Sequence, residues 1–198
     1  MGLIVQKYGG TSVANLERIR NVAKRVIRTH DRGHEVVVIV SAMSGVTDRL
    51  IALAREINES PDKRELDALL ATGEQTTAAL LAMMLTSMGS PAQSLMGFQV
   101  QVRTDQCFGN ARIQDIRVDR VRSLLGSHSI VVVAGFQGCD AEGNITTLGR
   151  GGSDTSAVAI AAALKADECQ IYTDVTGVFT ADPNVVAKAR EIAGVTGE

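Results

Sequence analysis

Residues 3–40 read LIVQKYGGTSVANLERIRNVAKRVIRTHDRGHEVVVIV, and this stretch decides the fold class. It begins with the apolar run Leu3–Val5 and ends with the β-branched run Glu35–Val40, and each run leads into a turn that contains Gly or Ser. Such runs are typical of buried strands that end in loops. Between them, apolar residues recur at helical spacing: Val13, Leu16, Ile19, Val22, Val26 and Ile27. The stretch therefore predicts a β-α-β unit.

The rest of the chain continues this alternation of helices and strands. We predict helices over residues 47–58, 63–88, 118–125 and 153–166, strands over residues 98–104, 130–134 and 169–173, and a hairpin around residues 140–144. Gly73 is expected to interrupt the longest helix. The alternation predicts a three-layer α/β sandwich with a largely parallel central sheet, in which ligands bind beyond the carboxyl ends of the strands. Nothing resembling a linker or an internal repeat divides the chain, so we expect one domain.

The composition argues against several functional classes. Twenty Lys and Arg against 22 Asp and Glu leave a formal net charge of -2, so no global basic field attracts nucleic acid or an anionic membrane. Four Phe, two Tyr and no Trp disfavour an aromatic platform for single-stranded nucleic acid. The most apolar stretch, Ala78–Met84 with its neighbours, is too short and too polar to cross a bilayer. We therefore expect neither nucleic acid nor a membrane as a partner.

Cysteine and histidine residues show no metal-binding pattern. Cys107, Cys139 and Cys169 are odd in number and widely spaced, which predicts reduced thiols rather than a disulfide framework or a zinc site. The three histidines are scattered and form no HExxH motif, which predicts surface residues. The amino terminus also lacks the pattern of a secretory signal, so we expect a cytoplasmic protein.

The first loop of chemical interest is Lys7–Ser12, which follows a strand and opens a helix. Consecutive glycines allow backbone amides to approach a phosphate, and the helix amino terminus adds about half a positive charge. The loop matches neither the P-loop nor the protein-kinase signature. On these residues alone, a phosphate site and a solvated Lys beside a tight turn are equally good interpretations.

Two further loops follow strands and precede helices. Residues 41–48, SAMSGVTD, offer hydroxyl groups and space for a ligand, although Thr47 or Asp48 could equally cap the next helix. Residues 147–154, TLGRGGSD, place Arg150 among glycines, where its guanidinium could grip a carboxylate or phosphate through two parallel hydrogen bonds. Asp154 could hold Lys7 or act as a helix cap. Two Gly-rich turns with complementary charges favour an anion-binding site.

These loops resemble those of the aspartokinases, a group within the amino acid kinase superfamily. The matching segments are KYGGTSV at residues 7–13, SAMSGVTD at 41–48, Gly73-Glu74, Gly135-Phe136, GRGGSD at 149–154, YTDVTGV at 172–178 and Ala181-Asp182-Pro183. Their order and approximate separations match as well, from the first strand to about Arg190. The resemblance implies an amino acid kinase-like fold and Mg-ATP-dependent transfer of a phosphoryl group to the side-chain carboxylate of L-aspartate. The expected products are 4-phospho-L-aspartate and ADP, on the route to lysine, threonine and methionine.

The resemblance also implies roles for single residues. Lys7 would lie between the phosphates and the attacking carboxylate, and Asp154 would organise Lys7, so that these two residues form the catalytic pair. The remaining nucleotide-binding positions are Gly9, Gly10, Ser41, Thr173, Asp174 and Asp182. Within the substrate pocket, Arg150 would bind the α-carboxylate of aspartate and Glu74 its ammonium group. The other pocket residues are Thr47, Phe136, Gly151 and Ser153.

The charges expected in the substrate pocket make chemical sense for an amino acid. A zwitterion needs an opposite charge at each end, which Glu74 and Arg150 provide. The alternative interpretation of Glu74 is an exposed helix residue. No direct metal ligand is assigned, and Mg²⁺ is expected together with ATP. Family members also suggest a homo-oligomer.

The sequence departs from the family pattern in two places. Asn184 stands where an Arg usually ends the Asp-Pro loop, which removes one cationic contact to the nucleotide. Residues 193–198 stop where family kinase domains continue, so we expect residues 1–198 to be a catalytic domain that is incomplete at its nucleotide-binding end and lacks the regulatory ACT domains. Two alternatives remain open: a catalytically silent nucleotide-binding or assembly module, and a kinase for another small carboxylate.

Overall fold

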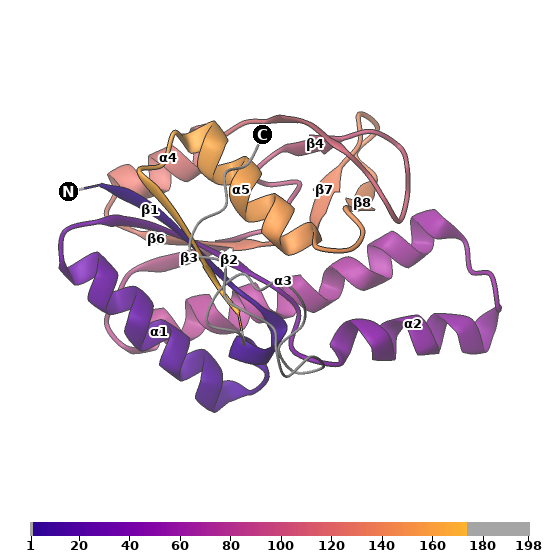
Figure 1. The fold of residues 1–198 in the computed structure, drawn as a ribbon, viewed down its shortest axis with the longest axis horizontal. Helices are drawn as coiled ribbons and strands as arrows, with labels where there is room; N and C mark the ends of the chain where they lie inside the picture. The colour runs from indigo at the N-terminus through magenta and orange to yellow at the C-terminus, as the bar shows by residue number, and fades with distance from the viewer. Residues whose placement is uncertain (1, 174–198) are drawn as a thin grey trace, which may run out of the picture.

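A five-stranded parallel sheet forms the centre of the protein, as a computed structural model that describes residues 2–173 shows (Figure 1). Its strands, in spatial order, are β3 (Ala92–Leu95), β6 (Ile130–Ala134), β2 (Glu35–Val40), β1 (Leu3–Tyr8) and β9 (Glu168–Tyr172). Every neighbouring pair runs parallel. The central strands are buried on both faces, which explains their unbroken apolar sequences. The predicted α/β sandwich is confirmed.

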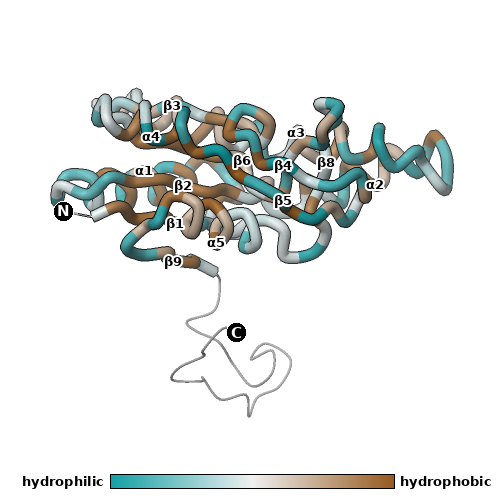
Figure 2. Tube along the Cα trace, turned by 90° about the horizontal axis from the view of Figure 1, so that it is seen from above, coloured by the Kyte–Doolittle hydropathy of each residue, from teal (hydrophilic) through white to brown (hydrophobic). Residues whose placement is uncertain are grey.

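Helices cover both faces of this sheet (Figure 1). α1 (Leu16–Asp31) and α3 (Lys63–Ser87) pack on one face, and α4 (Asp119–Gly126) and α5 (Gly152–Leu164) pack on the other. Alternate residues of β2 divide between the two cores, because successive side chains of a strand point to opposite faces. Val38 lies in the core beside α1 and α3, whereas Ile39 lies in the core beside α5. Figure 2 shows the apolar residues along β1 and β2 in the interior of the fold.

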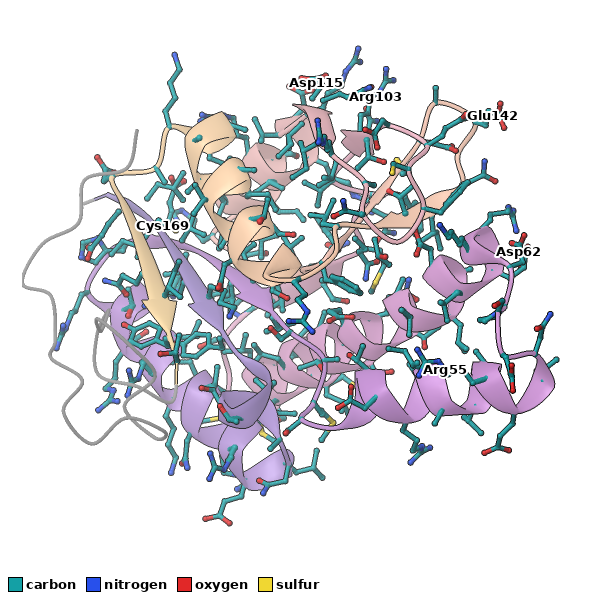
Figure 3. The ribbon with its side chains drawn as sticks, turned by 45° about the vertical axis from the view of Figure 1, so that its right-hand side comes forward. Arg55, Asp62, Arg103, Asp115, Glu142 and Cys169 are labelled. Carbon is teal, nitrogen blue, oxygen red and sulfur yellow. The ribbon has the colours of Figure 1, made fainter. Side chains whose placement is uncertain are left out.

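A second sheet of four short strands adjoins the main one. Its strands, in spatial order, are β5 (Ile113–Ile116), β4 (Val102–Thr104), β7 (Gln137–Cys139) and β8 (Ile145–Thr147). The antiparallel β7–β8 pair surrounds the turn at residues 140–144, as predicted. Arg103 and Asp115 are register partners across β4 and β5 and lie side by side in Figure 3. Opposite charges in such positions stabilise an antiparallel pair.

Two helical segments follow strands β1 and β2. The short 3₁₀ helix η1 (Gly10–Val13) follows β1, and α2 (Val46–Ile57) follows β2 and runs beside α3. Among the described residues, α3 is the one helix long and apolar enough to cross a membrane by length and composition, yet half of that stretch is buried inside the protein. Its buried residues include Asp67 and Glu74, whose carboxylates contact other parts of the chain. These contacts identify α3 as a core helix.

Two predictions of local structure need correction, and two strands were missed. The strand expected over residues 98–104 is reduced to β4, because the chain turns before it, with Gln101 at a φ of 54° and Phe98 48% exposed. The short strands β3 and β5 were not predicted. α3 continues through Gly73 without a break. A Cβ at Gly73 would lie 2.8 Å from the Cβ of Ala42, so this glycine permits close packing rather than ending the helix.

Candidate active site

Lys7 and Asp154 form an ion pair at the carboxyl end of the main sheet. Lys7 is the fifth residue of β1 and points to the same side as Val5, which packs against α5. Its Nζ lies 2.6 Å from Oδ1 of Asp154, in the first turn of α5, and its side chain is only 8% exposed, against 47% for Asp154. A buried ammonium needs such a partner. The pair therefore presents a fixed positive group at the edge of the sheet.

Three helices begin around this ion pair. η1 begins at Gly10, α2 at Val46 and α5 at Gly152, each after a strand or loop at the same end of the sheet. Gly10 must lie close to the loop after β2, because a Cβ there would be 2.8 Å from the carbonyl oxygen of Ala42. Helix amino termini present free N–H groups and partial positive charge. The arrangement favours an anion.

A cavity of about 280 Å³ opens beside the ion pair. It is lined by Lys7, Ser41, Ala42, Thr47, Glu74, Phe136, Gly149, Gly151, Gly152, Ser153 and Asp154. The sequence had singled out all of these as binding residues except Ala42, Gly149 and Gly152. Those three flank predicted residues within the same loops, so inspection of the loops as whole units would have found them.

Glu74 is the one buried carboxylate of this cavity. It is 3% exposed, and its Oε1 accepts a hydrogen bond of 3.0 Å from the backbone N–H of Ala42. Its Oε2 is buried and has no hydrogen-bond partner. Burial raises the pKa of Glu74 to about 7, and the hydrogen bond from Ala42 opposes this rise. The free oxygen is a ready acceptor for an ammonium group, and the interpretation of Glu74 as an exposed helix residue is wrong.

Arg150 is the one predicted substrate-binding residue that does not line the cavity. It lies between Gly149 and Gly151, which do, but its own side chain is exposed. Gly149 and Gly151 have φ values of 77° and 70°, so the turn that carries Arg150 adopts a conformation suited to glycine. Arg150 therefore sits on the rim of the cavity.

The predicted nucleotide residues fall into two groups. Gly9 and Gly10 follow β1, and the N–H of Gly9 donates to the carbonyl oxygen of Tyr172, one residue before Thr173. The loop after β1 thus adjoins the end of β9. Asp174 and Asp182 lie outside the described residues, as does Asn184. Residues 2–173 contain no group of three or more His, Cys, Asp or Glu that could hold a metal ion.

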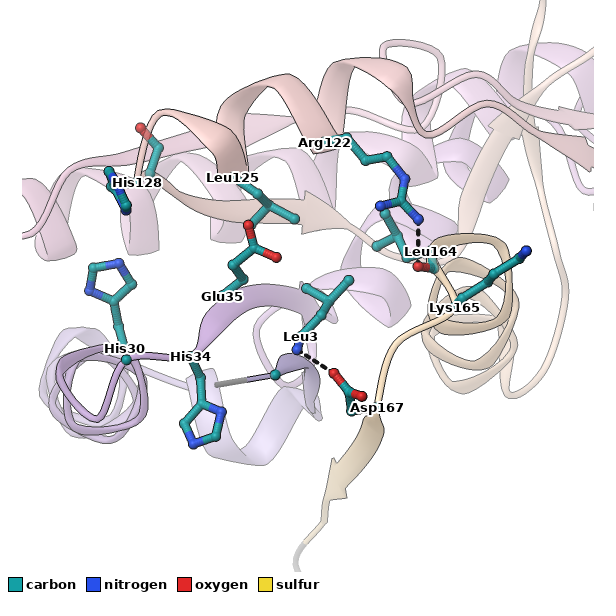
Figure 4. Close-up of a pocket in the computed structure, with 13 residues that line it drawn as sticks. Leu3, His30, His34, Glu35, Arg122, Leu125, His128, Leu164, Lys165 and Asp167 are labelled. Carbon is teal, nitrogen blue, oxygen red and sulfur yellow. Dashed lines mark hydrogen bonds between the residues drawn. The ribbon is translucent and has the colours of Figure 1, made fainter.

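A larger cavity of about 540 Å³ lies at the opposite, amino end of the strands (Figure 4). The prediction of scattered histidines is incomplete, because His30, His34 and His128 all line this cavity. Arg122 donates to the carbonyl oxygen of Leu164, and Asp167 accepts from the N–H of Leu3, so both tie secondary structures together. None of the predicted site residues lies there.

The fold recurs in known proteins. The model of the amino acid kinase family matches residues 2–198. The chain belongs to the amino acid kinase family. An aspartate kinase of Stutzerimonas stutzeri is a relative of this amino acid kinase, 59% identical over all of the chain and 48% of the relative. The chain spans about half the length of the curated relatives it matches.

Solved structures give the same result for the fold. The aspartate kinase from Synechocystis is 53% identical and superimposes with a TM-score of 0.80, over 95% of this chain and 31% of that one. E. coli aspartokinase III, solved in complex with aspartate and ADP, is 28% identical with a TM-score of 0.86, over 96% of this chain and 53% of that one. The amino acid kinase fold predicted from the motifs is therefore confirmed.

Proposed function

We propose that the chain carries the catalytic machinery of an aspartate kinase. The reaction is transfer of the γ-phosphoryl group of ATP to the side-chain carboxylate of L-aspartate, which gives 4-phospho-L-aspartate and ADP. One observation carries the proposal: buried Lys7 and the unpartnered Oε2 of Glu74 belong to the same cavity of about 280 Å³. A kinase for an amino acid needs a cation at the transferred group and an anion at the ammonium. The aspartate kinases among its relatives support this choice.

Catalysis follows from alignment and charge. The side-chain carboxylate of aspartate is already ionised at neutral pH, so the reaction needs neither a general base nor an enzyme nucleophile. Lys7 donates to the transferred phosphoryl group and the attacking oxygen, and Asp154 holds its Nζ in place at 2.6 Å. The backbone of Gly9 and the N–H of Gly10 border the transferred phosphoryl group, and the amino termini of α2 and α5 add further donors.

The substrate side of the cavity distinguishes the two ends of aspartate. The ammonium group donates to Oε2 of Glu74 and supplies the partner that this buried atom lacks. Arg150 folds from the rim over the α-carboxylate and donates two parallel hydrogen bonds. The surrounding walls come from Thr47, Phe136, Gly151 and Ser153.

The nucleotide side combines residues inside and outside the described range. Ser41 lines the cavity, Thr173 directly follows β9, and Asp174 and Asp182 complete the set in our proposal. Mg²⁺ bound to the phosphates would neutralise their charge. Mg²⁺ usually keeps several of its waters and binds through phosphates and one or two carboxylates. It therefore suits a site in which residues 2–173 form no preformed metal cluster. Asp154, which is 47% exposed, offers one such carboxylate.

We further propose a wider context for this chemistry. Residues 1–198 act as an amino acid kinase catalytic domain in the cytoplasm, as part of a homo-oligomer. The product of the reaction enters the biosynthesis of lysine, threonine and methionine. The length of the relatives, about twice that of this chain, makes the activity of the whole protein a separate question from that of the domain.

A coupled assay of ADP release tests the proposal. The chain should release ADP from Mg-ATP when aspartate is present and not when glutamate or acetylglutamate replaces it. Calorimetry with ADP and with aspartate should run in parallel, because binding of both ligands without turnover would favour the silent module. Release of ADP with glutamate but not with aspartate would refute the assignment of the substrate.

A further inference from the structure

Phe136 has a backbone conformation that few non-glycine residues adopt. Its φ is 68°, in the left-handed region, where a side chain crowds its own backbone. The residue follows β6 through Gly135, and its side chain lines the cavity. Such conformations persist only where the surrounding contacts hold them, and they are frequent at ligand sites. The contacts around Phe136 therefore decide the shape of this wall.

Two hydrogen bonds hold the main chain of Phe136 from both sides. Its N–H donates to Oγ of Ser156 at 2.9 Å, and its carbonyl oxygen accepts from the N–H of Leu148 at 2.9 Å. Leu148 leads directly into the turn that carries Arg150. Ser156 lies in the second turn of α5, shortly after Ser153. Phe136 is thus held between the two segments that form the rest of this wall.

Ser156 is placed to transmit this constraint. Its side chain is 1% exposed, and its hydroxyl donates to the carbonyl oxygen of Gly152 at 2.8 Å while accepting from Phe136. A Cβ on Gly152 would lie 2.7 Å from Cδ2 of Phe136, so the ring rests directly on the glycine backbone. One hydroxyl therefore fixes Phe136 relative to the first turn of α5, where Ser153 and Asp154 lie.

We infer that Ser156 is a positioning residue that sets the width of the aspartate side of the cavity. It does not line the cavity and acts through Phe136 and Gly152. The inference rests on the proposed function, because it concerns aspartate in that pocket. The nucleotide side, which begins with Gly9 and Gly10 on another loop, does not depend on this hydroxyl.

Ser156→Ala in the full chain tests the inference. Without the hydroxyl, the N–H of Phe136 loses its acceptor and the wall relaxes. We expect aspartate affinity, measured by calorimetry, to fall about tenfold, while ADP affinity stays within about twofold. Amide hydrogen exchange, followed by NMR, should become faster at Phe136. Ser156→Thr keeps the hydroxyl and should preserve both the affinity for aspartate and the slow exchange.

Thr77→Val provides a matched control for the loss of a buried hydroxyl. Thr77 is fully buried and donates to the carbonyl oxygen four residues earlier, as Ser156 does, but its acceptor Gly73, unlike Gly152, does not line the cavity. Its substitution should lower stability without changing aspartate affinity. If Ser156→Ala does not fold, Ser156→Cys replaces it, because a thiol of similar size is a weaker acceptor and should show the same changes.

The possible results separate the two proposals. Unchanged aspartate affinity in Ser156→Ala, or an equal loss in Thr77→Val, would overturn the role of Ser156. So would unchanged exchange at Phe136. If the unsubstituted chain bound ADP but not aspartate, the proposed function would fail instead, whether or not exchange at Phe136 changed.

Discussion

At the scale of single residues, the candidate site depends on charges that are buried at different depths. Lys7 is almost fully buried and paired with Asp154, Glu74 is buried and half satisfied, and Arg150 is exposed. Burial strengthens electrostatic interactions because the local dielectric constant is low. Lys7 and Glu74 should thus act as preformed parts of the site, whereas Arg150 must move to contribute.

Lys7→Ala should lower turnover far more than ligand affinity. The substitution removes a preorganised donor at the transferred group, a loss that typically reduces the rate about 100- to 1000-fold. ADP release in the presence of saturating aspartate and ATP measures the effect. Lys24→Ala, on the exposed surface of α1, is the control. Near-normal turnover of a folded Lys7→Ala enzyme would contradict the catalytic role.

Arg150→Lys should weaken aspartate binding and leave nucleotide affinity largely unchanged. Lysine keeps the positive charge but cannot form two parallel hydrogen bonds to a carboxylate. The loss should be about 1 to 2 kcal/mol of binding free energy. Separate titrations with aspartate and ADP give the two affinities, and an equal loss for both would indicate a folding defect instead.

Glu74 makes the stability of the free protein depend on pH. Burial raises its pKa from 4.5 to about 7, so between these values the folded state keeps a proton that the unfolded state releases. Stability contributed by this group is therefore present at low pH and is lost as the pH rises from 4.5 through 7. Glu74→Gln carries no such charge. As the pH rises from 5 to 8, its free energy of unfolding should increase by about 1 to 3 kcal/mol relative to that of the unsubstituted protein.

Denaturant unfolding at several pH values measures this difference. Aspartate binding should change in the opposite sense, because its ammonium group needs the ionised carboxylate, so affinity should rise through pH 7 in the unsubstituted protein only. Identical pH profiles of stability for the two proteins would show that Glu74 is not the titrating group.

At the scale of elements, close packing of α3 against the loop after β2 places the Glu74 carboxylate in the site. Gly73 lies against Ala42, and the next residue, Glu74, accepts from the N–H of the same Ala42. The helix therefore approaches the loop after β2 at the one position where it has no side chain. This contact sets the position of the carboxylate in the cavity.

Gly73→Ala should weaken aspartate binding even though alanine favours a helix by about 1 kcal/mol. The new Cβ would lie 2.8 Å from the Cβ of Ala42 and would push α3 away from the loop. Overpacking of this kind costs about 1 to 3 kcal/mol. Gly126→Ala, in α4 with open space around it, should be neutral or slightly stabilising. Calorimetry and thermal unfolding of both variants test this, and identical behaviour would exclude the proposed contact.

The sequence predicted the elements whose patterns are local. The long strands and helices of the main sheet follow from continuous apolar runs and from helical spacing, and the loops after β1 and β2 and before α5 follow from their glycines and charges. In the small sheet the hairpin was predicted, but β5 was missed and the bounds of β4 were wrong, because both strands are short and owe their stability to pairing rather than to an apolar face.

Other features depend on contacts between distant segments. Asp67 belongs to the inward face of α3, seven residues before Glu74, and a polar residue on an apolar face was the one available signal. The hydroxyl of Ser156 gave no signal at all, since its partner Phe136 lies 20 residues away. The periodicity of a sequence predicts which side of a helix or strand is buried, but it does not predict which residues that side contacts.

At the scale of the whole molecule, Asp67 joins the main body to the small sheet. Its fully buried carboxylate accepts hydrogen bonds from the N–H and the hydroxyl of Thr147, both at 2.8 Å, and from the N–H of Gly109 at 3.0 Å. Thr147 ends β8 and leads into the turn that carries Arg150. The orientation of the small sheet is therefore coupled to α3.

Asp67→Ala should destabilise the protein strongly because it leaves buried donors without an acceptor. We expect a loss of about 2 to 4 kcal/mol, which corresponds to a fall in Tm of roughly 5 to 15 °C for a protein of this size. Asp62→Ala removes the exposed cap of the same helix, and its loss should be nearer to 1 kcal/mol. Thermal unfolding compares the two, and equal losses would contradict the role given to Asp67.

The position of β1 has a consequence for the newly made chain. β1 pairs with β2 on one side and with β9 on the other, so one of its partners follows shortly and the other lies about 164 residues away. At ribosomal rates, roughly ten to thirty seconds separate the synthesis of β1 from that of β9. During that interval the apolar edge of β1 stays open to other nascent chains, so chaperone binding at this early segment should matter more for yield than for final stability.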